Sequence, residues 1–279
     1  MVRAFLFAIV SGLILTPLGW AQARQWQFRW QQGQTLTYVV EHATSAAEVV
    51  GDSKSDTRTK LNLTKRWQVL DVDASGVATL QLSLAALRLE ATTPTGGVLL
   101  FDSNDPAKSD EHMREELGKF VGQPLAVLRM DVYGRVVEVK ESKHGPASRF
   151  DSELPFVFTL PAGAPAPGQE WDRAYKITLA PPQGTGEKYD AVQKYVCKAV
   201  ANGLATLTLS TELKNMPENA LDRVPLLQLQ PEGEVVFDIA HGRLHSASLK
   251  IEKELKGHQG EGSSYKFQSS YTEKYVENK

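Results

Sequence analysis

The chain has 279 residues, of which 42% are hydrophobic when glycine is left out, and its formal net charge is −2. A chain of this length and composition can bury a substantial core, so disorder along its whole length is excluded. The balanced charge produces no long-range field that would attract nucleic acid or an anionic membrane, and we expect neither as a partner.

The first residues have the three parts of a secretory signal peptide. Arg3 supplies a positive charge, residues 4–18 are almost wholly apolar, and Ala21-Gln22-Ala23 provides the small residues that precede a cleavage site. The apolar run is shorter than the roughly 20 residues of a membrane-spanning helix. We therefore expect residues 1–23 to be removed on export and the mature protein to be periplasmic or extracellular. No later segment is long and apolar enough to cross a bilayer.

Most of the mature chain is predicted to form antiparallel β-sheet. Apolar and polar residues alternate through residues 78–84 and again through residues 205–209. Successive side chains of a strand point to opposite faces, so each run predicts a strand with one buried and one solvated face. This alternation is typical of antiparallel sheets that are covered on one side.

The order of the turns indicates an internal duplication. Three pairs of segments match in the same order: residues 33–38 with 168–175, residues 69–80 with 196–207, and residues 131–136 with 238–244. The second pair has Ser-Gly or Asn-Gly between two strands, and the third has Gly-Arg, as tight hairpins require. We therefore predict two related β-rich units with curved, half-barrel-like sheets, residues 24–149 and residues 150–279.

One short amphipathic helix is expected in the first unit. Ser109 is a candidate N-cap before two acidic residues, and Gly118 or Gly122 is a candidate end. Apolar residues at helical spacing define its buried side: Met113, Leu117, Phe120 and Val121. The proline-rich residues 146–167 are expected to connect the two units and to dock on the sheet through Phe158 and its neighbours.

Cys197 is the only cysteine, so no intramolecular disulfide can form. It lies in a strand-like run, where a free cysteine is favoured as a small buried hydrophobe. The alternative is a nucleophile, which would need a base close to it in space.

Aromatic residues recur at even spacing in the last predicted strand: Tyr265, Phe267, Tyr271 and Tyr275. Such a stripe is usually part of the core. A ligand-facing stripe would have the same pattern, because pockets are also lined mainly by apolar and aromatic side chains. We take these residues as candidate ligand-binding residues.

The sequence contains no motif that assigns a reaction or a cofactor. A Gly-x-Ser-x-Gly elbow, a Walker loop, a dinucleotide fingerprint and a His-Glu-x-x-His motif are all absent. His241 and His245 would share a face on a helix, but Gly242 indicates a turn between them, which favours a surface pair over a zinc site. We assign no catalytic residue, no metal ligand and no cofactor.

The chain resembles an uncharacterised family of exported bacterial proteins that is catalogued as a domain of unknown function. The resemblance depends on these landmarks: Trp67-Gln68-Val69 with Val72 and Gly76, Phe101-Asp102-Ser103, Val121-Gly122-Gln123-Pro124, Asp131 with Gly134, and Gly168 with Trp171. The family has no assigned reaction, so the resemblance implies no catalytic residue.

Three functions are compatible with these features. The leading hypothesis is a non-enzymatic binding protein that holds an apolar or lipid-like ligand on the concave face of a curved sheet, an analogy at the level of the fold. The second is an envelope or extracellular interaction module that pairs through its β edges. The third is a hydrolase whose site has no recognisable motif.

Overall fold

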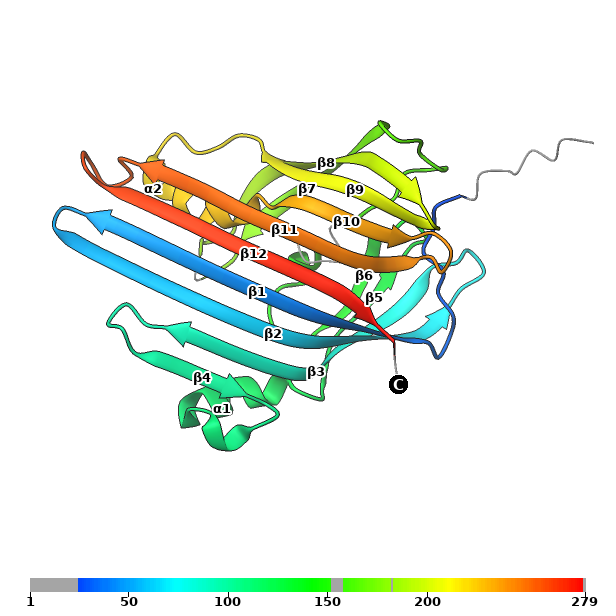
Figure 1. The fold of residues 1–279 in the computed structure, drawn as a ribbon, viewed down its shortest axis with the longest axis horizontal. Coiled ribbons are helices and arrows are strands. Elements are labelled where there is room, and N and C mark those ends of the chain that lie inside the picture. Colours follow the sequence, from blue (N-terminus) through cyan, green and yellow to red (C-terminus); the bar gives the residue numbers. More distant parts are fainter. Residues whose placement is uncertain (1–24, 152–157, 182, 278–279) are drawn as a thin grey trace, which may run out of the picture.

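The computed structural model describes residues 25–151, 158–181 and 183–277, so the predicted signal peptide lies outside the described residues. Within them, twelve strands form one sheet in the order β6-β5-β3-β2-β1-β12-β11-β10-β9-β8-β7, with β4 paired to β3 (Figure 1). The strands are β1 (Thr35–Val50), β2 (Ser53–Val72), β3 (Ala78–Thr92), β4 (Val98–Asp102), β5 (Pro124–Met130), β6 (Val136–Ser142), β7 (Glu170–Leu179), β8 (Glu187–Ala201), β9 (Leu204–Leu213), β10 (Glu232–Asp238), β11 (Arg243–Lys256) and β12 (Ser264–Val276).

The predicted class, mainly β with a curved antiparallel sheet, is confirmed. Every pairing between named strands is antiparallel. The alternating runs lie in β3 and β9, and the matched hairpins lie at the β2–β3 and β8–β9 turns. Asn202 and Gly203 both have positive φ, 52° and 77°, as the tight β8–β9 turn requires.

The strands of the two predicted units join in a single sheet. β1 pairs with β12 from Thr37↔Val276 to Val49↔Ser264, and this long pairing connects the strands of residues 35–142 to those of residues 170–276. In Figure 1 the long strands β11, β12, β1 and β2 lie side by side, with β5 and β6 behind them at one end and β8 and β9 above them. The division into two repeat domains stays a prediction.

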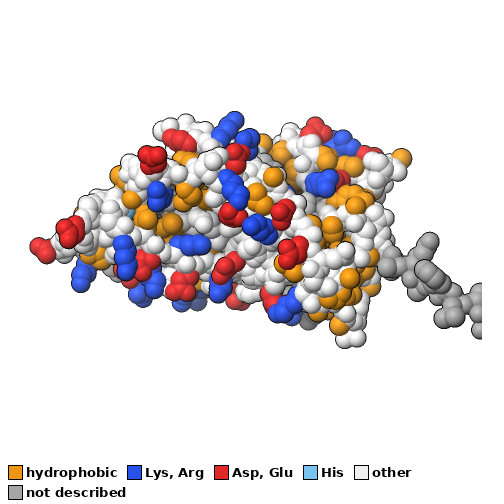
Figure 2. All heavy atoms as spheres, turned by 90° about the horizontal axis from the view of Figure 1, so that it is seen from above, with side chains coloured by type: hydrophobic (Ala, Val, Ile, Leu, Met, Phe, Trp, Pro, Cys, Tyr) orange, Lys and Arg blue, Asp and Glu red, His pale blue; other side chains and the backbone are white. Residues whose placement is uncertain are grey.

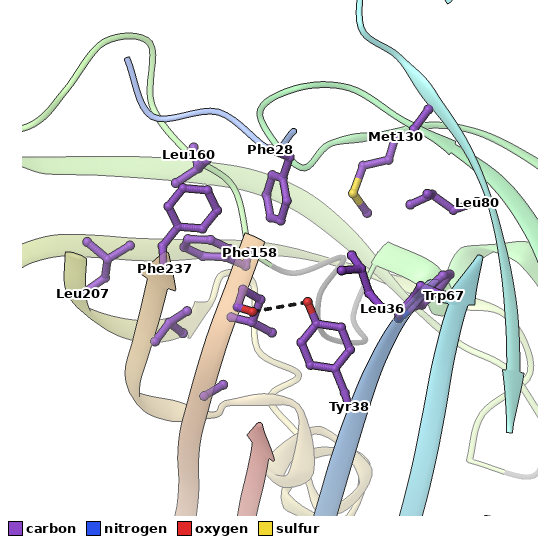
Figure 3. Packing of buried hydrophobic residues seen from close by; sticks show 14 of the residues in the cluster. Phe28, Leu36, Tyr38, Trp67, Leu80, Met130, Phe158, Leu160, Leu207 and Phe237 are labelled. Carbon is purple, nitrogen blue, oxygen red and sulfur yellow. Dashed lines mark hydrogen bonds between the residues drawn. The ribbon is translucent and has the colours of Figure 1, made fainter. Parts of the chain in front are cut away.

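One hydrophobic cluster occupies the concave side at that end of the sheet. It includes residues from both halves of the strand order, such as Leu128 of β5 and Tyr195 of β8. Phe28, from the segment before β1, packs with its ring centroid 5.2 Å from that of Phe237 and 6.0 Å from that of Phe158. The buried hydroxyl of Tyr38 donates a hydrogen bond to the carbonyl of Leu244, 3.2 Å away (Figure 3).

The N-terminal segment connects the two matched Gly-Arg turns. The amide of Phe28 donates to the carbonyl of Val132 in the β5–β6 turn, and the amide of Arg29 donates to the carbonyl of Gly242 in the β10–β11 turn, at 2.8 and 2.9 Å. Phe158, from the predicted connection between the units, is fully buried, so this part docks as expected. Residues 152–157 lie outside the described residues.

A β-bulge in β3 changes which residues face inward. The β2–β3 register shifts between Thr64 and Lys65, where the β3 partner changes from Ala86 to Leu84. The extra residue, Ala85, reverses the phase of the alternation, so Leu84 and Leu87 are both buried. Such bulges bend a strand and increase its twist, and this one contributes to the curvature of the sheet.

Short helices cover parts of the concave side and the sheet margins. They are α1 (Glu111–Leu117), α2 (Ala220–Arg223) and the 3₁₀ turns η1 (Pro106–Lys108), η2 (Gly118–Phe120), η3 (Ala147–Asp151) and η4 (Val224–Leu229). The predicted helix is confirmed as α1, and all four of its predicted apolar residues pack around Leu84 and Phe101. Its N-cap is Asp110 rather than Ser109, because the Ser109 hydroxyl accepts a hydrogen bond from the amide of Asp102.

The outer surface carries charges of both signs in close alternation. In the face shown in Figure 2, Lys and Arg side chains are interspersed with Asp and Glu, and neither sign dominates an area. Neighbouring strands contribute oppositely charged partners, for example Lys194 of β8 and Glu212 of β9, at 2.9 Å. Exposed pairs of this kind contribute little to stability but keep the outer face solvated.

Among the described residues, no helix has both the length and the apolar character needed to span a membrane.

Candidate functional site

The concave face contains a cavity of about 480 Å³ beside the main core. The long central strands β1, β2, β3, β11 and β12 form its walls, and Leu125 of β5, Arg149 of η3, Gln228 of η4 and Pro231 complete it. The side chains from the five central strands are Val40, His42, Leu61, Leu63, Lys65, Leu82, Leu84, Leu87, Leu249, Lys250, Ile251, Ser269 and Tyr271.

Apolar side chains, chiefly leucine, make most of the cavity wall. β3 contributes Leu82, Leu84 and Leu87, and the bulge at Ala85 is what brings the last of these to the same face as the first two. On the β3 side, α1 and η2 pack against the cluster that contains Leu84 and Leu87 and so hold this part of the wall. An apolar wall that is held by surrounding packing suits a ligand with an extended hydrocarbon surface.

A buried ion pair lies at the polar end of the cavity. The Lys65 ammonium is 2.9 Å from Oε1 of Glu273, and the two side chains are 11% and 0% exposed. The Tyr271 hydroxyl donates to Oε2 of Glu273 at 2.7 Å, and Lys65 donates to the Tyr271 oxygen at 3.4 Å. Lys65 and Tyr271 line the cavity, with Glu273 behind them, so the charge that faces the cavity has a counter-charge beside it.

His42 and Ser269 continue the polar strip along β1 and β12. Nε2 of His42 is 2.9 Å from the Ser269 hydroxyl, and its ring packs edge-on against Tyr271 with a centroid distance of 5.8 Å. Burial lowers the pKa of His42, because the charged imidazolium is less well solvated there. The imidazole is therefore neutral near pH 7, with one ring nitrogen as donor and the other as acceptor.

The predicted aromatic stripe is divided among three surroundings. Tyr265, Phe267, Tyr271 and Tyr275 alternate with exposed residues along β12, but only Tyr271 lines the cavity. Phe267 and Tyr265 pack in a separate cluster with residues of η4 and β11. Tyr275 packs against the main core, with the guanidinium carbon of Arg243 3.8 Å from its ring centroid. Ligand binding by these residues stays a prediction.

Other cavity residues were not recognised in the sequence. Lys65 interrupts an alternation of inward-facing residues in β2, Leu61, Leu63, Trp67 and Val69. A lysine at a strand position whose alternating neighbours are apolar and inward-facing indicates a buried partner or a ligand contact. His42 and Ser269 gave no comparable signal, because their neighbours in the sequence are small or polar residues.

The buried-hydrophobe interpretation of Cys197 is confirmed. Its side chain is fully buried in the main cluster, and burial raises the pKa of the thiol. A thiol in such surroundings is protonated and poorly nucleophilic.

Of the histidine pair expected at the surface, His241 is exposed and His245 is partly buried in β11. His241 is in the β10–β11 turn with Nδ1 2.7 Å from the Asp238 carboxylate, and its side chain is 62% exposed. In the parts of the chain that the structure describes, no group of three His, Cys, Asp or Glu side chains is arranged to hold a metal ion.

A second hollow, of about 630 Å³, lies beside β7 and has a mainly polar lining. Within it, Arg173 donates to Oε1 of Gln193 at 3.0 Å, and the Trp171 indole donates to the Thr159 carbonyl at 2.9 Å. The first bond joins β7 to β8, and the second attaches the connection between the units to the sheet. A lining of this kind suits solvent better than an apolar ligand.

Comparison with known proteins assigns no family. No family model matches the chain, and no curated protein matches it. DynF from the dynemicin biosynthesis pathway of Micromonospora chersina is 7% identical, with 97% of this chain and 94% of that chain covered and a TM-score of 0.23. A DUF1329 family protein from Desulfovibrio piger is 10% identical, with coverage of 88% and 84% and a TM-score of 0.15.

The structure of the MucA/MucB complex from Pseudomonas aeruginosa is 8% identical, with 85% of this chain and 89% of that chain covered and a TM-score of 0.14. Similarities at these scores transfer no function. One neighbour carries the name of an uncharacterised family, but no family model matches. The resemblance to exported proteins of unknown function therefore stays a prediction.

Proposed function

We propose that this protein is a non-enzymatic binding protein that holds an apolar or lipid-like ligand in the cavity of its curved sheet. The observation that carries the proposal is the cavity of about 480 Å³ on the concave face, whose wall is mostly apolar and rich in leucine. This volume lies within the roughly 300–1,000 Å³ of small-molecule pockets. The protein would act after export, as the pattern of residues 1–23 favours.

Binding is tested with N-phenyl-1-naphthylamine, an uncharged apolar fluorophore whose emission rises in apolar surroundings. Leu61 lines the cavity from β2, and the neighbouring Asn62 is exposed on the opposite face. Leu61→Trp fills part of the cavity, and Asn62→Trp adds the same side chain outside it. We expect Leu61→Trp to weaken probe binding at least about tenfold, the effect of losing roughly 1.4 kcal/mol of apolar contact. Asn62→Trp should bind as the parent does.

Equal probe binding by Leu61→Trp and the parent would contradict the proposal, because the probe would then bind elsewhere. An organic extract of the purified protein, analysed by mass spectrometry, provides a second measurement. The proposal predicts a lipid-like molecule in the extract of the parent and less of it in the extract of Leu61→Trp.

Pairing through β edges is the second candidate, and exposed apolar residues on marginal strands favour it. Val98 of the short strand β4 is 59% exposed, and Val137 of the edge strand β6 is 52% exposed. Edge strands with apolar side chains can pair with another chain. Light scattering on the purified protein tests this function, which predicts a dimer that Val137→Lys converts to monomer.

A further inference from the structure

We infer that the cavity selects an amphiphile with a hydrocarbon chain and an uncharged, hydrogen-bonding head, such as an alcohol, ester or amide. This inference rests on the proposed function and specifies its ligand class. It depends on the charges around the cavity and on the chemistry of the polar strip formed by His42, Lys65, Ser269 and Tyr271.

The polar strip carries no net charge once its partner is included. The Lys65 ammonium is balanced by the fully buried Glu273 carboxylate at 2.9 Å. An anionic head drawn to Lys65 would lie close to that carboxylate and would compete with it for the same ammonium. Because Glu273 has no access to solvent, weakening its ion pair is unfavourable, and an anion gains little there.

A cationic head is also disfavoured. Lys65, Lys250 and Arg149 all line the cavity, and no carboxylate of the residues that the structure describes does so. Lys250 is 3.5 Å from Glu232 and its side chain is 68% exposed, so it belongs mainly to the outer surface. Arg149 donates to the His144 carbonyl and lies over the Phe150 ring at 5.3 Å. Lys250 and Arg149 therefore have other partners, and a ligand cation at the polar end would lie next to the Lys65 ammonium, with no carboxylate among the described lining residues to balance it.

The remaining groups of the strip are suited to an uncharged head. Ser269 has a hydroxyl, which donates and accepts, and the neutral imidazole of His42 does the same through its two nitrogens. His42 of β1 and Ser269 of β12 are two and three strands away from β3 in the sheet, so the hydrocarbon chain of a ligand can contact the β3 leucines while its head reaches the strip. An alcohol, ester or amide can form such hydrogen bonds without adding a charge to the cavity.

The test uses three probes with the same chain, dodecanol, dodecanoate and dodecylammonium, as competitors of N-phenyl-1-naphthylamine at pH 7.5 and below their aggregation concentrations. We expect dodecanol to displace the fluorophore at a concentration at least tenfold lower than either charged probe. If dodecanoate or dodecylammonium matches dodecanol, or if none of the three displaces the fluorophore, the inference is wrong. The proposed function fails separately, when Leu61→Trp leaves fluorophore binding unchanged.

A variant of the strip distinguishes head recognition from simple partition into the cavity. Ser269→Ala removes one hydroxyl from the strip, and Ser270→Ala removes one from the exposed face of the same strand. We expect Ser269→Ala to weaken dodecanol about fivefold, the effect of losing one hydrogen bond, and to leave binding of the fluorophore within twofold. Equal dodecanol affinities for the two variants would overturn the role of the strip.

Discussion

The buried ion pair of Lys65 and Glu273 should have a large and unequal effect on stability when either partner is removed. Lys65→Met leaves the Glu273 carboxylate, whose side chain is 0% exposed, with Tyr271 as a hydrogen-bond donor but with no counter-charge. Breaking a buried pair in this way costs about 3–5 kcal/mol. That is a large fraction of the roughly 5–15 kcal/mol by which a typical folded protein is stable.

The opposite change should cost less. Glu273→Gln keeps an oxygen that can accept from the Tyr271 hydroxyl, and it leaves Lys65, whose side chain is 11% exposed and borders the cavity. The ammonium can therefore recover some hydration, and we expect a loss of about 2–3 kcal/mol. The double change Lys65→Met with Glu273→Met replaces both charges by apolar groups of similar size and should cost less than either single change.

Urea unfolding followed by tryptophan fluorescence measures these free energies, provided that the slope with denaturant stays constant among the variants. The control is Lys194→Met, which removes an ammonium that is also 2.9 Å from a carboxylate but whose side chain is 52% exposed. Its effect should be much smaller, because solvent screens the pair. Two results would contradict the description of a buried, coupled pair. One is a loss of unfolding free energy for Lys65→Met no larger than that for Lys194→Met. The other is a loss for the double variant equal to the sum of the losses for the two single variants.

Three further predictions concern other parts of the fold. Burial lowers the pKa of His42 below 6.5, so the unfolded chain binds a proton at this residue more readily than the folded protein does. The free energy of unfolding should therefore fall as the pH drops below about 6.5. Urea midpoints measured at several pH values should fall less for His42→Gln than for the parent. The buried Cys197 thiol should react with a thiol reagent only as fast as urea unfolds the chain, and rapid reaction of the native protein would contradict its burial. Gly134 has a φ of 83°, and a Cβ there would lie 2.6 Å from the Phe158 carbonyl oxygen, so Gly134→Ala should lower the free energy of unfolding by about 2–4 kcal/mol. Gly33 has a similar φ of 81° but open space around it, so Gly33→Ala should lower it by only about 1–2 kcal/mol in the same urea assay.

Local features of the fold could be predicted from the sequence because they depend on neighbouring residues. Alternation predicts the strands β3 and β9, and Asn202-Gly203 predicts a turn with positive φ. The spacing of Met113 and Leu117 predicts the buried side of α1. Each of these signals is contained in a few consecutive positions, so no knowledge of the distant chain is needed.

The cavity could not be predicted in the same way, because its walls come from distant parts of the chain. It depends on the pairing of β1 with β12, in which Tyr38 and Tyr275 lie opposite each other. Alternation specifies which side chains of a strand share a face, but it does not specify which strand lies next to it. The Ala85 bulge is a second reason why the cavity could not be predicted. It changes which alternate residues of β3 face inward, and so brings Leu87 to the cavity.

The most informative residues for such a site are charged residues at positions where alternation calls for an apolar one. Lys65 has this property in β2 and Glu273 has it in β12, and their charges are opposite. A buried charge is unfavourable unless it is paired, so each implies a partner on the same concave face. Together they limit the strand order: β2 and β12 must lie close enough for the two side chains to meet, and the single strand β1 that separates them satisfies this condition. The same pair accounts for the proposed selectivity, because the Lys65 ammonium is already neutralised by Glu273, and the cavity therefore provides hydrogen bonds without demanding a charge from its ligand.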